Sequence, residues 1–177
     1  MNRLIIYGSH YGTAKAYAEE FARRTGIPAV NYTAKTDLSS YDEILHFGGL
    51  YAGGVKGLKD TLAALPQSAK LLIVTVGLAD VTKKENTDHI RESIRRQVPQ
   101  SILARTSIFH LRGGIDYSRL TFLHKTMMSF VYKKAKNTPE EEKTAEDWDM
   151  ITTYNKRVNF VDFSALDAIV DALQENL

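Results

Sequence analysis

A short segment near the start of the chain carries residue types that bind phosphate. Residues 8–14 read GSHYGTA, between a β-type run and an amphipathic helical pattern. Free N–H groups and the dipole at a helix N-terminus attract phosphate, and Ser9 and Thr13 add hydroxyl donors. No Gly-Lys-Ser/Thr follows and the glycines do not form G-x-G-x-x-G, which disfavours nucleoside triphosphates and dinucleotides. The alternative is a helix cap that binds nothing.

A second glycine-rich segment contains one aromatic side chain. Residues 48–54 read GGLYAGG, so a flat ring could stack on Tyr51 while backbone N–H groups donate to the ring edge. The alternative is a buried structural tyrosine. A third segment, GLAD at residues 77–80, is small and would border the same ring.

The composition limits the chemistry available. The chain has no cysteine, which excludes disulfides, thiolate metal sites and iron–sulfur clusters. Its 5 histidines show no metal-ligand spacing, so no metal site is expected. Redox chemistry would therefore need an organic cofactor.

β-rich runs alternate with helical patterns along all 177 residues. The runs are 4–7, 29–32, 44–47, 71–76 and 106–111; the helices are 13–24, 58–65, 82–97 and 164–177, with Thr82 and Ser164 as predicted caps. This alternation predicts one α/β domain, a three-layer sandwich around a five-stranded parallel sheet of order 2-1-3-4-5.

Most of the 11 glycines follow the predicted strands. With this strand order a ligand binds at the C-terminal edge of the sheet, between the first and third strands. The glycine-bearing loops therefore predict a binding rim at that edge. The alternative is that glycine only ends strands.

The two glycine segments and the strand order together resemble the flavodoxin family. That family's first loop follows Ser/Thr-x-Thr-Gly-x-Thr; here Ser9, Gly12 and Thr13 fall in that loop, while Tyr11 and Ala14 stand where the family often has Thr. The resemblance implies FMN as the cofactor, with its phosphate on the first loop and its ring between the second and third. The expected cofactor-binding residues are Ser9, His10, Tyr11, Gly12, Thr13, Ala14, Gly49, Leu50, Tyr51, Ala52, Gly53, Gly54, Gly77, Leu78, Ala79, Arg112 and Gly113.

The stretch from about 115 to 160 exceeds what a five-stranded flavodoxin needs, and it predicts a helical insertion after the fifth strand. It is similar to the flavodoxin-like protoporphyrinogen dehydrogenases, which pass electrons to quinone and carry a basic, Met-rich helix there. The counterparts here are Arg119–Lys136, the polar loop Asn137–Asp149 and the pair Asp162-Phe163, where that family favours Thr-Asp-Trp.

The predicted insertion helix combines an apolar stripe with basic charge. Leu120, Leu123, Met127, Phe130 and Val131 share one face, and 119–136 contains basic residues and no acids. Two functional interpretations follow: a lid over a hydrophobic substrate, or a peripheral helix on an anionic membrane. The alternative is packing on the domain's own flank or in a homodimer.

Two functions from different classes remain open. One is an FMN-dependent oxidoreductase acting on a porphyrinogen, a quinone or a similar flat molecule; the other is an electron carrier docking on a redox partner protein. The net charge of +2, with Arg112 at the predicted rim, favours the enzyme over an acidic carrier. Arg112, Asp116, Tyr117 and His124 are candidates for proton transfer by position only, so no catalytic residue is assigned. No signal peptide or nucleic-acid site is expected, which predicts a cytoplasmic protein, peripheral at the inner face of the membrane if the helix binds lipid.

Overall fold

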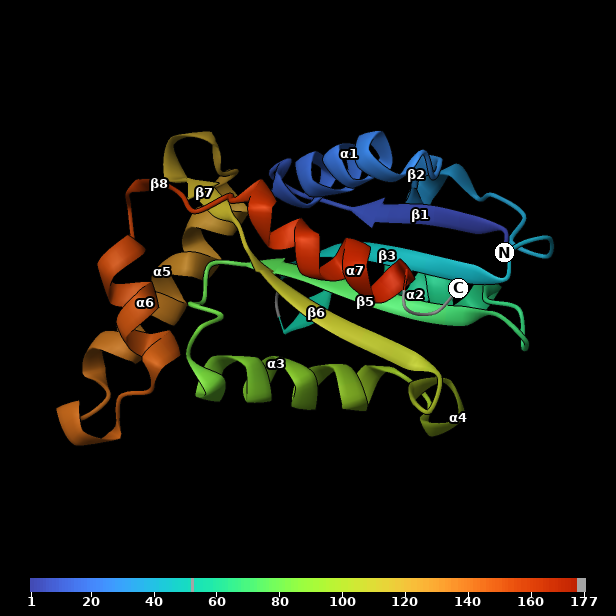
Figure 1. The fold of residues 1–177 in the computed structure, drawn as a ribbon. Helices are drawn as coiled ribbons and strands as arrows, with labels where there is room; N and C mark the ends of the chain where they lie inside the picture. The colour runs from blue at the N-terminus through green and yellow to red at the C-terminus, as the bar shows by residue number, and fades with distance from the viewer. Residues whose placement is uncertain (52, 175–177) are drawn as a thin grey trace.

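The central sheet has the predicted strand order. A computed structural model describes residues 1–51 and 53–174, and its main sheet runs β2-β1-β3-β5-β6 (Figure 1). These parallel strands are β1 (Arg3–Gly8), β2 (Ala29–Asn31), β3 (Glu43–Tyr51), β5 (Lys70–Gly77) and β6 (Thr106–Arg112). A short strand, β4 (Gly54–Val55), turns back antiparallel to β3, an addition that the sequence patterns did not predict.

Helices cover both faces of the sheet, which confirms the three-layer prediction. On one face α1 (Thr13–Thr25) and α7 (Asp167–Gln174) bury Tyr17, Phe21 and Ile169 against the strands. On the other face α2 (Leu58–Ala64) and α3 (Lys84–Gln97) contribute Leu58 and Ile94 to a second core. A one-turn helix, α4 (Gln100–Leu103), precedes β6. Strands buried on both faces explain the nearly continuous apolar runs in the sequence.

Two predicted helix starts are wrong, and in both the predicted Thr or Ser cap donates to an aspartate two residues before it. The N–H and hydroxyl of Thr82 both donate to the Asp80 carboxylate, and α3 begins two residues later. The N–H and hydroxyl of Ser164 both donate to Asp162, which caps the 3₁₀ turn η4 (Phe163–Leu166) before α7. A carboxylate is the stronger acceptor of the two side-chain types. The predicted end of the last helix, at Leu177, lies outside the described residues.

The insertion is a compact subdomain at the C-terminal ends of the strands (Figure 1). It comprises β7 (Gly114–Asp116), α5 (Phe122–Asn137), α6 (Ala145–Thr153) and β8 (Arg157–Asn159), and β7 pairs antiparallel with β8. The remaining 3₁₀ turns are η1 (Tyr32–Ala34), η2 (Tyr117–Arg119) and η3 (Glu140–Glu142). The insertion thus lies at the same edge as the predicted ligand site.

Helix α5 packs on one side only. Met128 joins the small core of Ile115, Tyr117 and Leu120, and Tyr132 stacks on Tyr154 with ring centroids 4.0 Å apart. The opposite side exposes Phe122 by 87%, Leu123 by 72% and Phe130 by 68%. Packing on the domain's own flank therefore accounts for half of the helix and leaves the other half exposed.

Candidate functional site

The first loop presents an uncapped helix N-terminus. Gly12 is the N-cap of α1 with φ +93°, a left-handed conformation that glycine adopts without strain, and no side chain caps the first turn. The Gly12 N–H donates to Ser9 Oγ at 3.0 Å, which fixes the loop. The first turn of α1 also contains no acidic residue. Backbone N–H groups in this arrangement suit an anion such as a phosphate.

The strand-end glycines bring the loops close to one another. A Cβ at Gly8 would lie 2.1 Å from the Lys56 carbonyl oxygen, and one at Gly113 would lie 2.8 Å from Cγ1 of Val76. At these two positions glycine is required by packing between protein segments rather than by ligand contact. The strand register sets Gly8 beside Gly48 and Gly77 beside Arg112, so all the loops meet at one edge.

A cavity lies where the loops meet. It contains about 560 Å³ of empty space, part of it open to solvent. Its walls come from the first three loops, the start of β7 and helix α5. The lining residues are Ser9, His10, Tyr11, Thr13, Gly49, Leu50, Tyr51, Val76, Gly77, Leu78, Gly113, Gly114, Ile115 and Met128.

Four rings cluster at the mouth of this cavity. The Tyr51 ring lies 4.5 Å from His10 and 4.9 Å from His124, between centroids. The Tyr11 hydroxyl and His124 Nδ1 share a hydrogen bond. Burial lowers the pKa of His10, and the nearby charges of Lys56 and His124 lower it further, so His10 is neutral at pH 7. The head of α5 is thereby held against both the first and the second loop.

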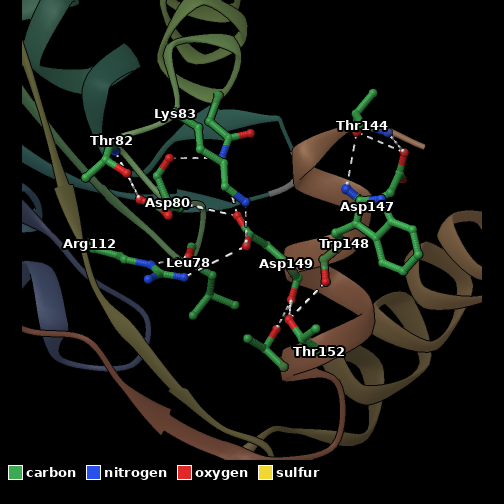
Figure 2. A network of polar contacts seen from close by, with 12 residues as sticks. Leu78, Asp80, Thr82, Lys83, Arg112, Thr144, Asp147, Trp148, Asp149 and Thr152 are labelled. Atoms are coloured by element: carbon green, nitrogen blue, oxygen red, sulfur yellow. Dashed lines mark hydrogen bonds and ion pairs between the residues drawn. The ribbon is translucent and has the colours of Figure 1, made fainter. Parts of the chain in front are cut away.

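A polar network fastens the third loop to the insertion (Figure 2). Asp149 of α6 accepts from the Asp80 N–H at 3.0 Å and from the buried Asn86 side chain at 3.3 Å. Arg112 and Lys83 each place a nitrogen 3.9 Å from the same carboxylate. Arg112 also donates from Nε to the Leu78 carbonyl at 3.0 Å. The network thus fixes the backbone of the third loop beside the cavity.

A family model identifies the domain. The flavodoxin-domain model matches residues 4–142, most of the chain. The chain belongs to the flavodoxin family. Membership supports FMN as the cofactor, and the residues fit it: the uncapped turn of α1 offers phosphate donors, and the cavity between the loops has two phenol rings, those of Tyr11 and Tyr51, at its wall.

Solved structures of flavodoxins also match this flavodoxin-family chain. A flavoprotein of Lactobacillus acidophilus in complex with FMN is 12% identical, with a TM-score of 0.42, covering 63% of this chain and 91% of that one. The flavodoxin of Streptococcus pneumoniae is 17% identical, with a TM-score of 0.44 and coverages of 66% and 88%. A mutant flavodoxin of Pseudomonas aeruginosa is 19% identical, with a TM-score of 0.43 and coverages of 77% and 97%. The comparison with curated proteins finds no match.

The structure gathers most of the residues predicted to bind flavin around the cavity, with some exceptions. Gly53, Gly54 and Ala79 line a neighbouring cavity instead. Ala14 is buried in the core. Neither Gly12, the N-cap of α1, nor Arg112, which faces Leu78 and Asp149, lines either cavity. Ala52 lies outside the described residues.

Four lining residues of the cavity were not predicted. Val76 and Gly114 directly adjoin predicted residues, so widening each segment by one position would have found them. Ile115 and Met128 belong to the insertion, for which a lid over a substrate is one of the sequence interpretations, but its apolar stripe does not indicate which residues face the cavity.

The positional candidates for proton transfer differ in their surroundings. Burial raises the pKa of Tyr117 to about 12, and its ring packs edge-on against Tyr154, which makes it a core residue. Asp116 accepts from Ser118 and caps η2. His124 contacts the loops of the cavity, through Tyr11 and Tyr51.

Proposed function

We propose that this chain binds FMN between its loops and acts as an FMN-dependent oxidoreductase on a flat organic molecule, such as a porphyrinogen that it oxidises or a quinone that it reduces. The observation that carries the proposal is that the insertion forms a wall of the flavin cavity, through Ile115 and Met128. When bound, FMN supplies hydride and single-electron chemistry.

The residues have separable roles in this proposal. The first turn of α1 binds the phosphate, and Tyr51 orients the ring. The insertion excludes water, since Met128 and the ring of His124 lie over the loops. An electron carrier instead needs a ring edge that a partner protein can reach, so an enclosing insertion favours the enzyme.

Phosphate recognition is tested by comparing FMN with riboflavin. We expect FMN to bind much more tightly and to raise the melting temperature more at equal concentration, because only FMN occupies the α1 N-terminus. Equal affinities, measured by fluorescence quenching, would rule out the phosphate loop.

A pair of matched variants separates binding from folding. Gly12→Val and Gly26→Val both place a branched residue at positive φ, at opposite ends of α1 and in open space. Both should lose stability, but only Gly12→Val should weaken FMN binding while leaving riboflavin binding close to wild type.

Turnover distinguishes the enzyme from the carrier. Supplied with a porphyrinogen as electron donor and a quinone as electron acceptor, FMN-loaded protein should oxidise the first and reduce the second with repeated turnover. Rapid electron exchange with a flavodoxin reductase, without turnover of either substrate, would establish the carrier instead.

We also propose that α5 rests on an anionic membrane. Its exposed apolar side chains, Phe122, Leu123 and Phe130, are accompanied by Lys125, Lys133, Lys134 and Lys136. Apolar groups flanked by lysines suit an anionic lipid surface, where each lysine contributes about 1 kcal/mol. In the described part of the chain, no helix is long and apolar enough to cross a bilayer.

A further inference from the structure

A second, larger cavity adjoins the flavin cavity. It contains about 1700 Å³ of empty space, part of it open to solvent, between α3, α5 and α6. Leu50, Tyr51, Gly77, Leu78 and Met128 line both cavities, so the two share a wall. A molecule in the second cavity would therefore lie beside a bound flavin.

The wall contributed by the insertion is apolar and adaptable. Met127, Met128, Val131 and Met150 come from α5 and α6 and face Ile90 of α3 across the space. Unbranched methionine side chains adjust to irregular apolar shapes. This wall suits the body of an apolar or aromatic molecule.

Most of the polar side chains on the walls are engaged within the protein. His89 pairs with Glu146 at 2.9 Å, and Asp147 accepts from Thr144 in the capping box of α6. Asp149 is held by the third-loop network described above. Ser93 and Gln97 both donate to the Gly53 carbonyl.

Arg96 differs from these groups. It lines the cavity and is exposed, and among the described residues no hydrogen bond or ion pair engages its guanidinium. It lies seven residues along α3 from His89, a distance of about 10 Å at 1.5 Å per residue. The Glu146 carboxylate pairs with His89 and therefore lies toward the other end of the cavity, away from Arg96.

We infer that this second cavity is the substrate site and that it takes an apolar organic anion, its body on the methionine wall and its carboxylate or sulfonate on Arg96. The inference rests on the proposed flavin function, for which it names the substrate class. It favours an acidic substrate over a neutral quinone.

The test uses two matched fluorescent probes on FMN-loaded protein. 8-Anilinonaphthalene-1-sulfonate (ANS) is an apolar anion, and N-phenyl-1-naphthylamine is the same molecule without the sulfonate. Arg96→Gln should weaken ANS binding by about threefold to fivefold, the size expected for a partly exposed ion pair, and leave the neutral probe unchanged. The visible flavin band should also shift as ANS saturates.

Two controls locate the binding. Arg95→Gln alters the neighbouring arginine, which pairs with Glu92 outside the cavity, and should have no effect. Phe130→Ser alters the exposed side of α5 and should also leave ANS affinity intact. ANS binding that depends on Phe130 and not on Arg96, or an unshifted flavin band, would overturn the inference.

Failure of the proposed function gives a different result. If the protein does not load FMN, its visible spectrum shows this before any probe is added, and the proposed function is lost. The Arg96 dependence of ANS binding can still be measured on the unloaded protein, where its absence would overturn the organic-anion site on its own.

Discussion

At the scale of single residues, a buried histidine holds the second loop in place. His46 lies in β3 with none of its surface exposed. Its Nε2 donates to the Lys56 carbonyl at 3.0 Å, and its Nδ1 accepts from the Thr61 hydroxyl at 2.9 Å. The contact with Thr61 needs the neutral imidazole, since the protonated ring could still donate to the Lys56 carbonyl but could not accept from Thr61. Burial lowers the pKa of His46 to about 4.

This histidine predicts a loss of stability in mild acid. Between pH 6.5 and about 4 the unfolded chain binds a proton at His46 and the folded chain does not, so the free energy of unfolding falls as pH falls. The loss should reach about 3 kcal/mol near pH 4. Denaturant unfolding across this range measures it.

His46→Gln is the comparison that isolates this effect. The variant should be less stable than the wild type at pH 7, but its free energy of unfolding should fall by less between pH 6.5 and 4. Some pH dependence will persist, because burial and the Arg91 charge also lower the pKa of His110, to about 4. Parallel pH profiles for wild type and variant would show that His46 is not the cause.

At the scale of elements, the third loop depends on a helix far away in the sequence. Asp149 of α6 accepts from the Asp80 N–H (Figure 2). It also accepts from the side chain of the buried Asn86. Asp149→Ala leaves both donors without this partner, which should cost about 1–3 kcal/mol of unfolding free energy. It should also weaken FMN binding, because the loop that carries Leu78 is released.

Glu146→Ala is the matched control on the same helix. Glu146 forms an exposed pair with His89 and should contribute at most about 1 kcal/mol. Equal losses of stability and FMN affinity in the two variants would contradict a specific anchoring role for Asp149.

At the scale of the whole molecule, the exposed side of α5 gives the protein one apolar, basic surface. We expect the protein to sediment with anionic liposomes at low salt, to sediment less with them at high salt, and not to sediment with neutral liposomes. A Phe122→Ser, Leu123→Ser, Phe130→Ser triple variant should stay in the supernatant. Trp148→Ser, which removes an exposed ring on α6, should still sediment.

Two outcomes bear on the role of this surface. If the wild type does not sediment with anionic liposomes, the membrane proposal fails. If it instead elutes as a dimer that the triple variant converts to monomer, the exposed side of α5 is an interface between two copies of the chain.

The sequence by itself determined the sheet and the three loops at its edge. The strands, the helices between them and the loop containing Ser9 and Thr13 are local in origin: they depend on apolar periodicity, on strand length and on glycine next to a helix start. These signals extend over a few residues, so a linear pattern contains them. Membership of the flavodoxin family and FMN as the supported cofactor follow from the same segments.

Only the tertiary structure decided how the insertion relates to the site. The contact of His124 with Tyr11 spans 113 residues, and that of Asp149 with Asp80 spans 69. The second cavity exists only because α5 and α6 pack across from α3. Such contacts depend on how separate elements pack in three dimensions, and a hydrophobic stripe on α5 is compatible with several partners. Sequence periodicity indicates that a helix has an apolar face, while the packing determines which part of that face is buried.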